Sequence, residues 1–191
     1  MIRPVLIVMA KAPRIGAGKT RLAAELGRVE AWRINRRLQS HALRVACGPR
    51  WRTLLCVAPD SATELALPGV WPRSVMRIAQ GRGDLGQRMA RAFARRRMVA
   101  MIGTDCPVLT RAHIRSAFDA LRRAPFALGP AEDGGFWLIA ARSGAAAARA
   151  MANVRWSTRH AARDVIANIG ASRVALLATL RDIDVAADLR G

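Results

Sequence analysis

The stretch "VLIVMAKAPRIGAGKTRL", residues 5–22, decides the fold class because it joins an apolar run to a glycine-rich loop ending in Gly-Lys-Thr. Residues 4–9 form a continuous apolar run, as expected for a strand that is buried on both faces of a sheet. The loop of residues 10–18 follows, and a helical pattern covers residues 19–47 with a break near Gly27. A buried strand, a glycine loop and a helix in this order predict the first unit of an α/β domain.

The alternation of strand, loop and helix continues along the rest of the chain. Further buried strands are predicted at residues 53–58, 74–79, 98–103, 126–131, 136–141 and 173–178. Asp84 with Gln87 and Thr110 have the spacing or position of helix N-caps. The pattern predicts a single domain over residues 1–191, with a three-layer α/β/α, Rossmann-like architecture and a mostly parallel sheet.

The composition points to anionic ligands. The 191 residues carry a formal net charge of +19, and all but two of the 32 basic residues are arginine. The two lysines, Lys11 and Lys19, both flank the glycine loop, which makes them more informative than any arginine. The arginines are scattered, aromatic residues make up only 5%, and no nucleic-acid-binding motif is present. We therefore expect phosphorylated small molecules rather than nucleic acid as partners.

The apolar residues and the cysteines indicate the cellular compartment. No run of eighteen apolar residues occurs, so we expect no membrane span. The first apolar run leads directly into the glycine loop and is interpreted as a strand rather than a signal peptide. Cys47, Cys56 and Cys106 are an odd and sparse set without metal-ligand spacing. These features predict a cytoplasmic protein without disulfides.

The glycine loop resembles a P-loop but departs from it at one position. The pattern G-x-x-x-x-G-K-[ST] is met at residues 18–20, whereas Pro13 stands where the opening glycine belongs. Proline removes a backbone amide donor and fixes φ, which opposes a tight wrap around phosphate. The alternative is an open loop in which Gly16 and Gly18 allow close backbone approach and Lys19 reaches the phosphates.

Carboxylates follow two of the predicted strands. In α/β sheets, ligands gather outside the carboxyl ends of the strands, where Asp105 and Asp133 are placed. Hard carboxylate oxygens suit Mg²⁺ or Mn²⁺. Asp133, in "EDGG" at 132–135, either shares this metal, orients an acceptor or only closes a hairpin turn. A P-loop kinase would also use Asp105 for Mg²⁺.

Three further motifs carry candidate residues. In "QGRGDLGQRM", residues 80–89, glycines meet a helix N-terminus, so Gln80 and Gly83 are candidates for nucleotide contacts and Asp84 for a cap. "WST", residues 156–158, has the residue types of a helix cap. "DIDVAADL", residues 182–189, offers either caps of a closing helix or, through Asp184, another metal ligand.

These motifs in this order resemble a bacterial family of glycosyltransferase-A-fold proteins, DUF2064, often labelled nucleotide-diphospho-sugar transferase or "transferase 1". The family is distantly similar to 2-phospho-lactate guanylyltransferase and molybdenum cofactor guanylyltransferase. The chain departs from the family pattern at Ile15, at Phe136-Trp137 and at Val185-Ala186. The resemblance implies that Asp105 is the metal-binding aspartate of the fold and that Trp156 and Ser157 wall the acceptor side.

Together, the residues and the resemblance predict a Mg²⁺-dependent transferase that binds an NTP or nucleotide sugar and a small anionic acceptor. Nucleotidyl transfer is the first hypothesis. The alternatives are a glycosyltransferase, a non-catalytic nucleotide- or polyanion-binding protein, and a P-loop kinase. The candidate catalytic residues are Lys19, Asp105 and Asp133, and the candidate metal ligands are Asp105, Asp133 and Asp184. The candidate nucleotide-binding residues are Lys11, Gly16, Gly18, Lys19, Gln80, Gly83 and Asp84. The candidate acceptor-binding residues are Gly134, Gly135, Trp156 and Ser157.

Overall fold

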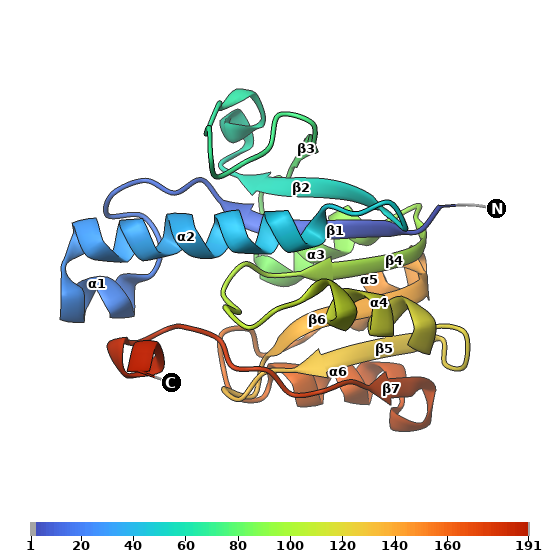
Figure 1. The fold of residues 1–191 in the computed structure, drawn as a ribbon. Coiled ribbons are helices and arrows are strands. Elements are labelled where there is room, and N and C mark those ends of the chain that lie inside the picture. The colour runs from blue at the N-terminus through green and yellow to red at the C-terminus, as the bar shows by residue number, and fades with distance from the viewer. Residues whose placement is uncertain (1–2, 191) are drawn as a thin grey trace.

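Seven strands form one mixed sheet in the computed structural model, which describes residues 3–190; the remaining residues of the predicted domain lie outside that range (Figure 1). The strand order is β3-β2-β1-β4-β6-β5-β7. Within this sheet β6 runs antiparallel to β4 and β5, and the other pairs are parallel, so the predicted mostly parallel sheet is confirmed. The strands are β1 (Val5–Lys11), β2 (Arg52–Ala58), β3 (Met76–Ala79), β4 (Arg97–Ile102), β5 (Phe126–Pro130), β6 (Phe136–Ser143) and β7 (Val174–Leu176).

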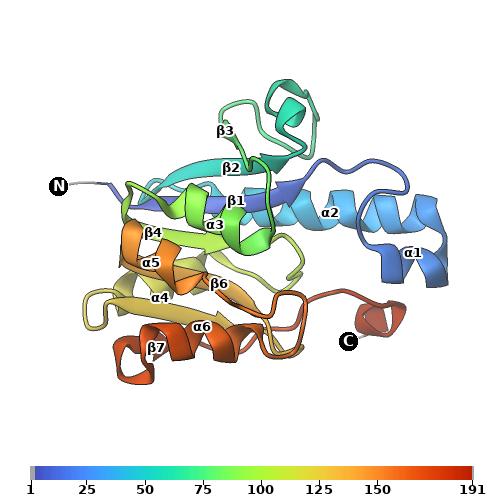
Figure 2. The ribbon, with the colours of Figure 1, turned by 180° about the vertical axis from the view of Figure 1, so that it is seen from behind.

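Helices cover both faces of the sheet and give the predicted three layers (Figures 1 and 2). The faces are separated by the alternation of side chains along β1: Leu6 and Val8 pack with α2 and α4, whereas Ile7 packs with α3, α5 and α6. Burial on both sides explains why β1 is a continuous apolar run. The helices are α1 (Thr20–Leu26), α2 (Arg28–Ala46), α3 (Leu85–Phe93), α4 (Arg111–Ala120), α5 (Gly144–Ala150) and α6 (Ala161–Ile169), with 3₁₀ turns η1 (Asp60–Glu64), η2 (Ala171–Arg173) and η3 (Ala186–Arg190). Within residues 3–190, no helix combines the length and apolar character that crossing a membrane requires.

Local signals in the sequence place several helix ends correctly, but the cap predicted at residues 156–158 does not form, because α6 begins only at Ala161 and the Thr158 hydroxyl bonds within the preceding loop. The predicted break falls at Gly27, whose φ of 82° ends α1 and starts α2. Asp84 and Gln87 form the predicted capping box of α3, and Thr110 caps α4. The predicted late strand is shorter than expected, because only residues 174–176 pair with β5.

Helix α2 extends past the carboxyl edge of the sheet, and α1 packs against this extension (Figure 1). The C-terminal segment returns to the same place, so that two distant parts of the chain share a small apolar cluster of their own. Its buried members are Leu22, Ala31, Ile34, Leu38 and Ile183. This cluster fixes the loop after β1 and the residues around position 183 against each other.

The strand order reverses between β1 and β4, which are parallel neighbours. The chain leaves β1 toward α1 and leaves β4 toward α4, and because the two strands are parallel, both connections start at the same edge of the sheet. A crevice therefore opens between the loop of residues 12–19 and the loop of residues 103–110, as is general at such switch points.

Candidate functional site

A cavity of about 770 Å³ occupies this crevice. It collects candidate residues from several separate motifs and so forms one site from segments that are far apart in the sequence. The candidates that line it are Lys11, Gly18, Lys19, Asp105, Asp133, Gly135, Trp156, Ser157 and Asp184.

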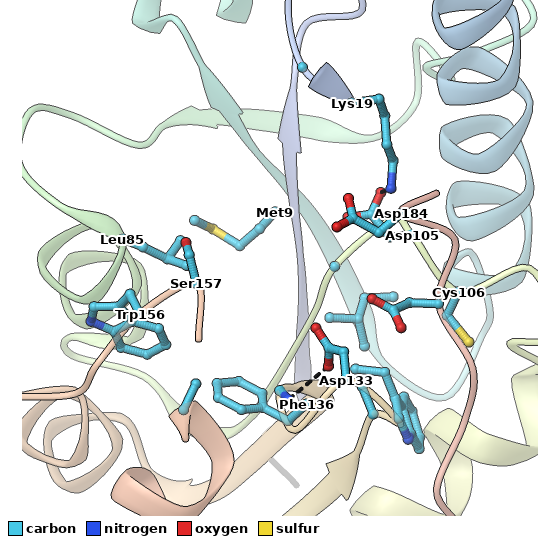
Figure 3. A pocket seen from close by; sticks show the side chains of 18 of the residues that line it. Met9, Lys19, Leu85, Asp105, Cys106, Asp133, Phe136, Trp156, Ser157 and Asp184 are labelled. Atoms are coloured by element: carbon cyan, nitrogen blue, oxygen red, sulfur yellow. Dashed lines mark hydrogen bonds and ion pairs between the residues drawn. The ribbon is translucent and has the colours of Figure 1, made fainter. Parts of the chain in front are cut away.

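Lys19 and Asp105 meet inside the cavity. The Lys19 Nζ lies 2.7 Å from Asp105 Oδ1 and also donates to the main-chain carbonyl of Ile183 (Figure 3). The Lys19 side chain is only 8% exposed, whereas that of Asp105 is 49% exposed. Lys19 adopts the left-handed conformation, with φ 49°, directly before α1, which turns its side chain toward the carboxyl edge of β4. The lysine therefore contributes a fixed positive charge next to an accessible carboxylate.

The loop before Lys19 lies open along α2. The Trp32 indole donates to the carbonyl of Pro13 at 2.9 Å, and the Gln39 amide donates to the carbonyl of Lys11 at 2.8 Å. The helix after the loop packs on α2 and not on the sheet. These contacts hold the start of the loop against α2, and Pro13, which stands where a P-loop has its opening glycine, has no amide to offer a phosphate.

Asp182, in the motif of residues 182–189, is a further carboxylate of the site that was not among the predicted metal ligands. It lines the cavity, and its pKa is raised by burial and by the negative charges of Asp133 and Asp105. Asp184, the predicted ligand, lies 2.7 Å from the Arg21 guanidinium, so its charge is already compensated. The two aspartates are two residues apart, and they differ in that Asp182 is partly buried beside Asp133 and Asp105, whereas Asp184 pairs with Arg21.

Asp133 closes a tight turn and also faces the cavity. Its Oδ1 accepts the backbone N–H of Gly135 at 2.7 Å within the β5–β6 hairpin (Figure 3). Gly134, at φ 85°, contacts the neighbouring loop so closely that a Cβ there would lie 2.3 Å from the Arg159 carbonyl oxygen. The hairpin interpretation and the site interpretation of "EDGG" are therefore compatible.

The opposite wall of the cavity is apolar. Met9, Leu85, Phe136 and Trp156 line it, across the cavity from Lys19 and Asp105 (Figure 3). The rings of Phe136 and Trp156 meet edge to face, with centroids 6.2 Å apart. Arg159, which follows "WST" and was not among the predicted site residues, also lines the cavity.

Five predicted site residues do not line the cavity: Gly16, Gln80, Gly83, Asp84 and Gly134. Gln80 is buried, and its amide donates to the carbonyls of Ala10 and Cys56, each at 3.0 Å. It thereby ties the ends of β1 and β2 together, and its donors are not available to a base. The Asp84 carboxylate caps α3.

Cys106 lines the cavity but does not have the properties of a nucleophile. Burial raises the pKa of its thiol to about 11, so the thiol is protonated at neutral pH.

The oxygen donors suit a divalent cation that is shared with a ligand. Within residues 3–190, no group of three or more His, Cys, Asp or Glu side chains is arranged to hold a metal by itself. Mg²⁺ usually takes one or two protein carboxylates and completes its shell with phosphate oxygens and water. Asp105 and Asp182, whose charges repel each other, fit such a partial set.

The architecture is that of the nucleotide-diphospho-sugar transferases. A candidate nucleotide-diphospho-sugar transferase from Desulfovibrio desulfuricans G20 superposes with a TM-score of 0.87 at 24% identity, covering 99% of this chain and 85% of that one. CMP:2-keto-3-deoxy-manno-octonic acid synthetase, solved with CTP, gives 0.61 at 12% identity over 98% and 95% of the two chains. Glucosyl-3-phosphoglycerate synthase from Mycobacterium tuberculosis, solved with Mn²⁺, UDP and glucosyl-3-phosphoglycerate, gives 0.51 at 10% identity over 94% and 71%. At these identities the likeness defines the fold.

Residues 41–158 match the family described as uncharacterized protein conserved in bacteria, DUF2064. The chain belongs to this family, as the order of its motifs predicts. A comparison with curated proteins found no match.

Proposed function

We propose that the chain is a single catalytic domain that uses a divalent cation to transfer a nucleotidyl group from an NTP to a small phosphorylated acceptor. The observation that carries the proposal is the contact of 2.7 Å between Lys19 and Asp105 at the carboxyl edge of β1 and β4. A polyphosphate that carries a metal ion requires a positively charged hydrogen-bond donor for its oxygens and a hard carboxylate for the metal. Lys19 and Asp105 supply these two groups at the same point of the crevice.

We assign the cation, Mg²⁺ or Mn²⁺, to Asp105 and Asp182, with Asp133 nearby. Asp182 replaces Asp184 in this role because Asp182 is partly buried beside the charges of Asp133 and Asp105, whereas Asp184 pairs with Arg21 at an exposed position. When bound, the metal supplies neutralisation of phosphate charge and polarisation of the phosphoryl oxygens.

The basic side chains act on the same polyphosphate. Lys11, Lys19 and Arg21 line the cavity, Lys11 from the end of β1 and the other two from the start of α1. Their charges attract the triphosphate, and Lys19 stabilises the negative charge that develops on departing pyrophosphate. A phosphorylated acceptor is anionic at neutral pH, so the reaction requires no protein base.

The fold comparisons support a nucleotide as the donor. One structural relative was solved with CTP, and another with Mn²⁺ and UDP. Neither identifies the base or the acceptor of this chain.

Calorimetry with a panel of NTPs and nucleotide sugars, with and without Mn²⁺, tests the proposal. We expect metal-dependent binding to the native protein and at least about a tenfold loss in Lys19→Ala and in Asp105→Asn. Asp119→Asn is the matched control, because this exposed aspartate on α4 lies outside the cavity.

The product distinguishes the alternatives. Nucleotidyl transfer releases pyrophosphate, whereas glycosyl transfer from a nucleotide sugar releases a nucleoside diphosphate. Equal binding of polyphosphate and nucleotides without metal, unchanged in the two variants, would favour a non-catalytic polyanion-binding protein and contradict the proposal.

A further inference from the structure

We infer that the apolar wall of the cavity is the acceptor subsite and selects an amphipathic oxyanion, with an apolar or planar body attached to a phosphate. This inference rests on the proposed function, because it assigns the acceptor of that reaction. We call the wall the apolar shelf and define it as Met9, Leu85, Met89, Phe136 and Trp156.

The apolar shelf presents large side chains to a cavity whose other side is charged. Leu85 is 42% exposed at the first turn of α3, and Phe136 and Trp156 are only partly buried. The labelled side chains of the shelf face Lys19, Asp105 and Asp184 across the cavity (Figure 3). Exposed apolar area of this kind favours a ligand that removes it from water.

The shelf offers few hydrogen bonds to a polyhydroxylated body. The Thr158 hydroxyl donates to the Arg155 carbonyl at 2.7 Å and accepts from the His160 N–H at 3.2 Å, so it is occupied. The other polar side chains near the shelf are Ser157, Arg159 and, beside Phe136, Asp133, whose Oδ1 already accepts the Gly135 N–H (Figure 3). A sugar would leave several hydroxyls unpaired here, whereas an apolar body would not.

The position of Trp156 is fixed before any ligand binds. Its indole lies over Gly86, where a Cβ would come within 2.5 Å of Nε1. The preceding residue, Arg155, makes two side-chain hydrogen bonds to Asp164, of 2.6 and 2.9 Å. A shelf held in this way binds a flat group with little loss of side-chain entropy.

The distribution of charge assigns the shelf to the acceptor rather than to the leaving group. In phosphoryl-type transfer, the attacking and leaving oxygens lie roughly in line on opposite sides of the phosphorus. Pyrophosphate, the more anionic group, belongs with Lys11, Lys19 and Arg21, which leaves the side of the shelf and Arg159 for the acceptor.

The bond changes in this step balance without a protein base. An acceptor phosphate oxygen forms a bond to the α-phosphorus as the bond to the bridging oxygen breaks. The electron pair of the broken bond leaves with pyrophosphate.

Calorimetry with two phosphate monoesters tests the inference on the full chain with Mn²⁺. We expect 1-naphthyl phosphate to bind at least about tenfold more tightly than glycerol 3-phosphate. Leu85→Ala should weaken the binding of 1-naphthyl phosphate about fivefold, because it removes an exposed apolar contact and leaves the Asp84 cap of α3 intact. Leu176→Ala is the matched control, since Leu176 is exposed on β7 outside the cavity.

A second titration separates the acceptor from the nucleobase. Naphthyl phosphate is added to protein saturated with Mn²⁺ and the tightest binder among ADP, GDP, CDP and UDP, and we expect a ternary complex. Competition between the two ligands, equal affinity for the two monoesters, or no effect of Leu85→Ala would overturn the inference. A native protein that binds no nucleotide with Mn²⁺ would instead contradict the proposed function.

Discussion

Asp182 carries an unfavourable charge in the folded protein, because burial and two neighbouring carboxylates raise its pKa. Because folding raises this pKa, the ionised carboxylate destabilises the native state when the pH is above the pKa of the unfolded chain, about 3.9. At lower pH the carboxyl is protonated in both states and the cost disappears. We therefore expect Asp182→Asn to raise the thermal unfolding midpoint at pH 7 but not near pH 3. The same variant should lose Mn²⁺-dependent nucleotide binding, which calorimetry measures.

The control for this experiment is Asp184→Asn. Asp184 pairs with Arg21 at an exposed position, so its removal should lower stability by no more than about 1 kcal/mol. Metal-dependent binding should stay within a few-fold of the native value. If Asp184→Asn lost metal-dependent binding and Asp182→Asn kept it, Asp184 would be the metal ligand.

Substitutions at Gly134 and Gly69 distinguish the cost of backbone strain from the cost of close packing. Both have positive φ, but a Cβ at Gly69 would meet nothing within 4 Å, whereas one at Gly134 would collide with the Arg159 main chain. We expect Gly69→Ala to cost about 1 kcal/mol and Gly134→Ala about 3 kcal/mol in urea unfolding. Equal costs would mean that the loop containing Arg159 moves away from the added Cβ at position 134 without loss of stability.

At the scale of elements, the Arg155–Asp164 pair attaches the loop of Trp156 to the first turn of α6. The Arg155 guanidinium and backbone N–H hold the pKa of the Asp164 carboxyl well below its usual range. This stabilisation is present above the unfolded pKa, about 3.9, and is lost as pH falls further.

Asp164→Asn should therefore lower the unfolding midpoint at pH 7, and the difference from the native protein should narrow below about pH 4. Thermal unfolding followed by circular dichroism across this range measures the effect. The control is Asp119→Asn, which removes the same charge from an aspartate that forms no ion pair within residues 3–190. Its unfolding midpoint should differ from that of the native protein by an amount that does not change with pH. A difference that is constant with pH would assign the effect to packing.

Ile183 anchors the C-terminal segment below α1 and α2. It is buried with Leu22 and Leu38, its N–H donates to the Asp105 carbonyl at 2.9 Å, and its carbonyl accepts from Lys19. We expect Ile183→Ala to cost about 2 kcal/mol in urea unfolding and to weaken nucleotide binding, because Asp182 loses its position. Loss of stability without loss of binding would show that the segment is held by its polar contacts alone.

The elements could be predicted largely because their signals are local. The continuous apolar run of β1, the break at Gly27 and the capping box at Asp84 each depend on a few adjacent residues. The site was predictable only in part, because its pairings are between distant segments. The pairing of Arg21 with Asp184 and the burial of Gln80 between two strands leave no local pattern.

At the scale of the whole molecule, the formal charge of +19 gives the protein a net positive field. Such a field accelerates the encounter with anions and is screened over about 10 Å at 0.1 M salt. We expect the association rate of the nucleotide to fall about tenfold between roughly 0.02 and 0.2 M salt, with little change in the dissociation rate. Stopped-flow binding measures both rates, and a salt effect confined to dissociation would assign it to local contacts such as Lys19.

The two walls of the cavity belong to different layers of the molecule. Lys19 and Arg21 depend on the packing of α1 with α2, whereas Leu85 and Trp156 depend on α3 and the residues before α6. Substitutions on one wall can therefore accumulate without disturbing the other. We therefore expect substitutions at positions 85, 136 and 156 to reshape the apolar wall while the contact between Lys19 and Asp105 stays in place.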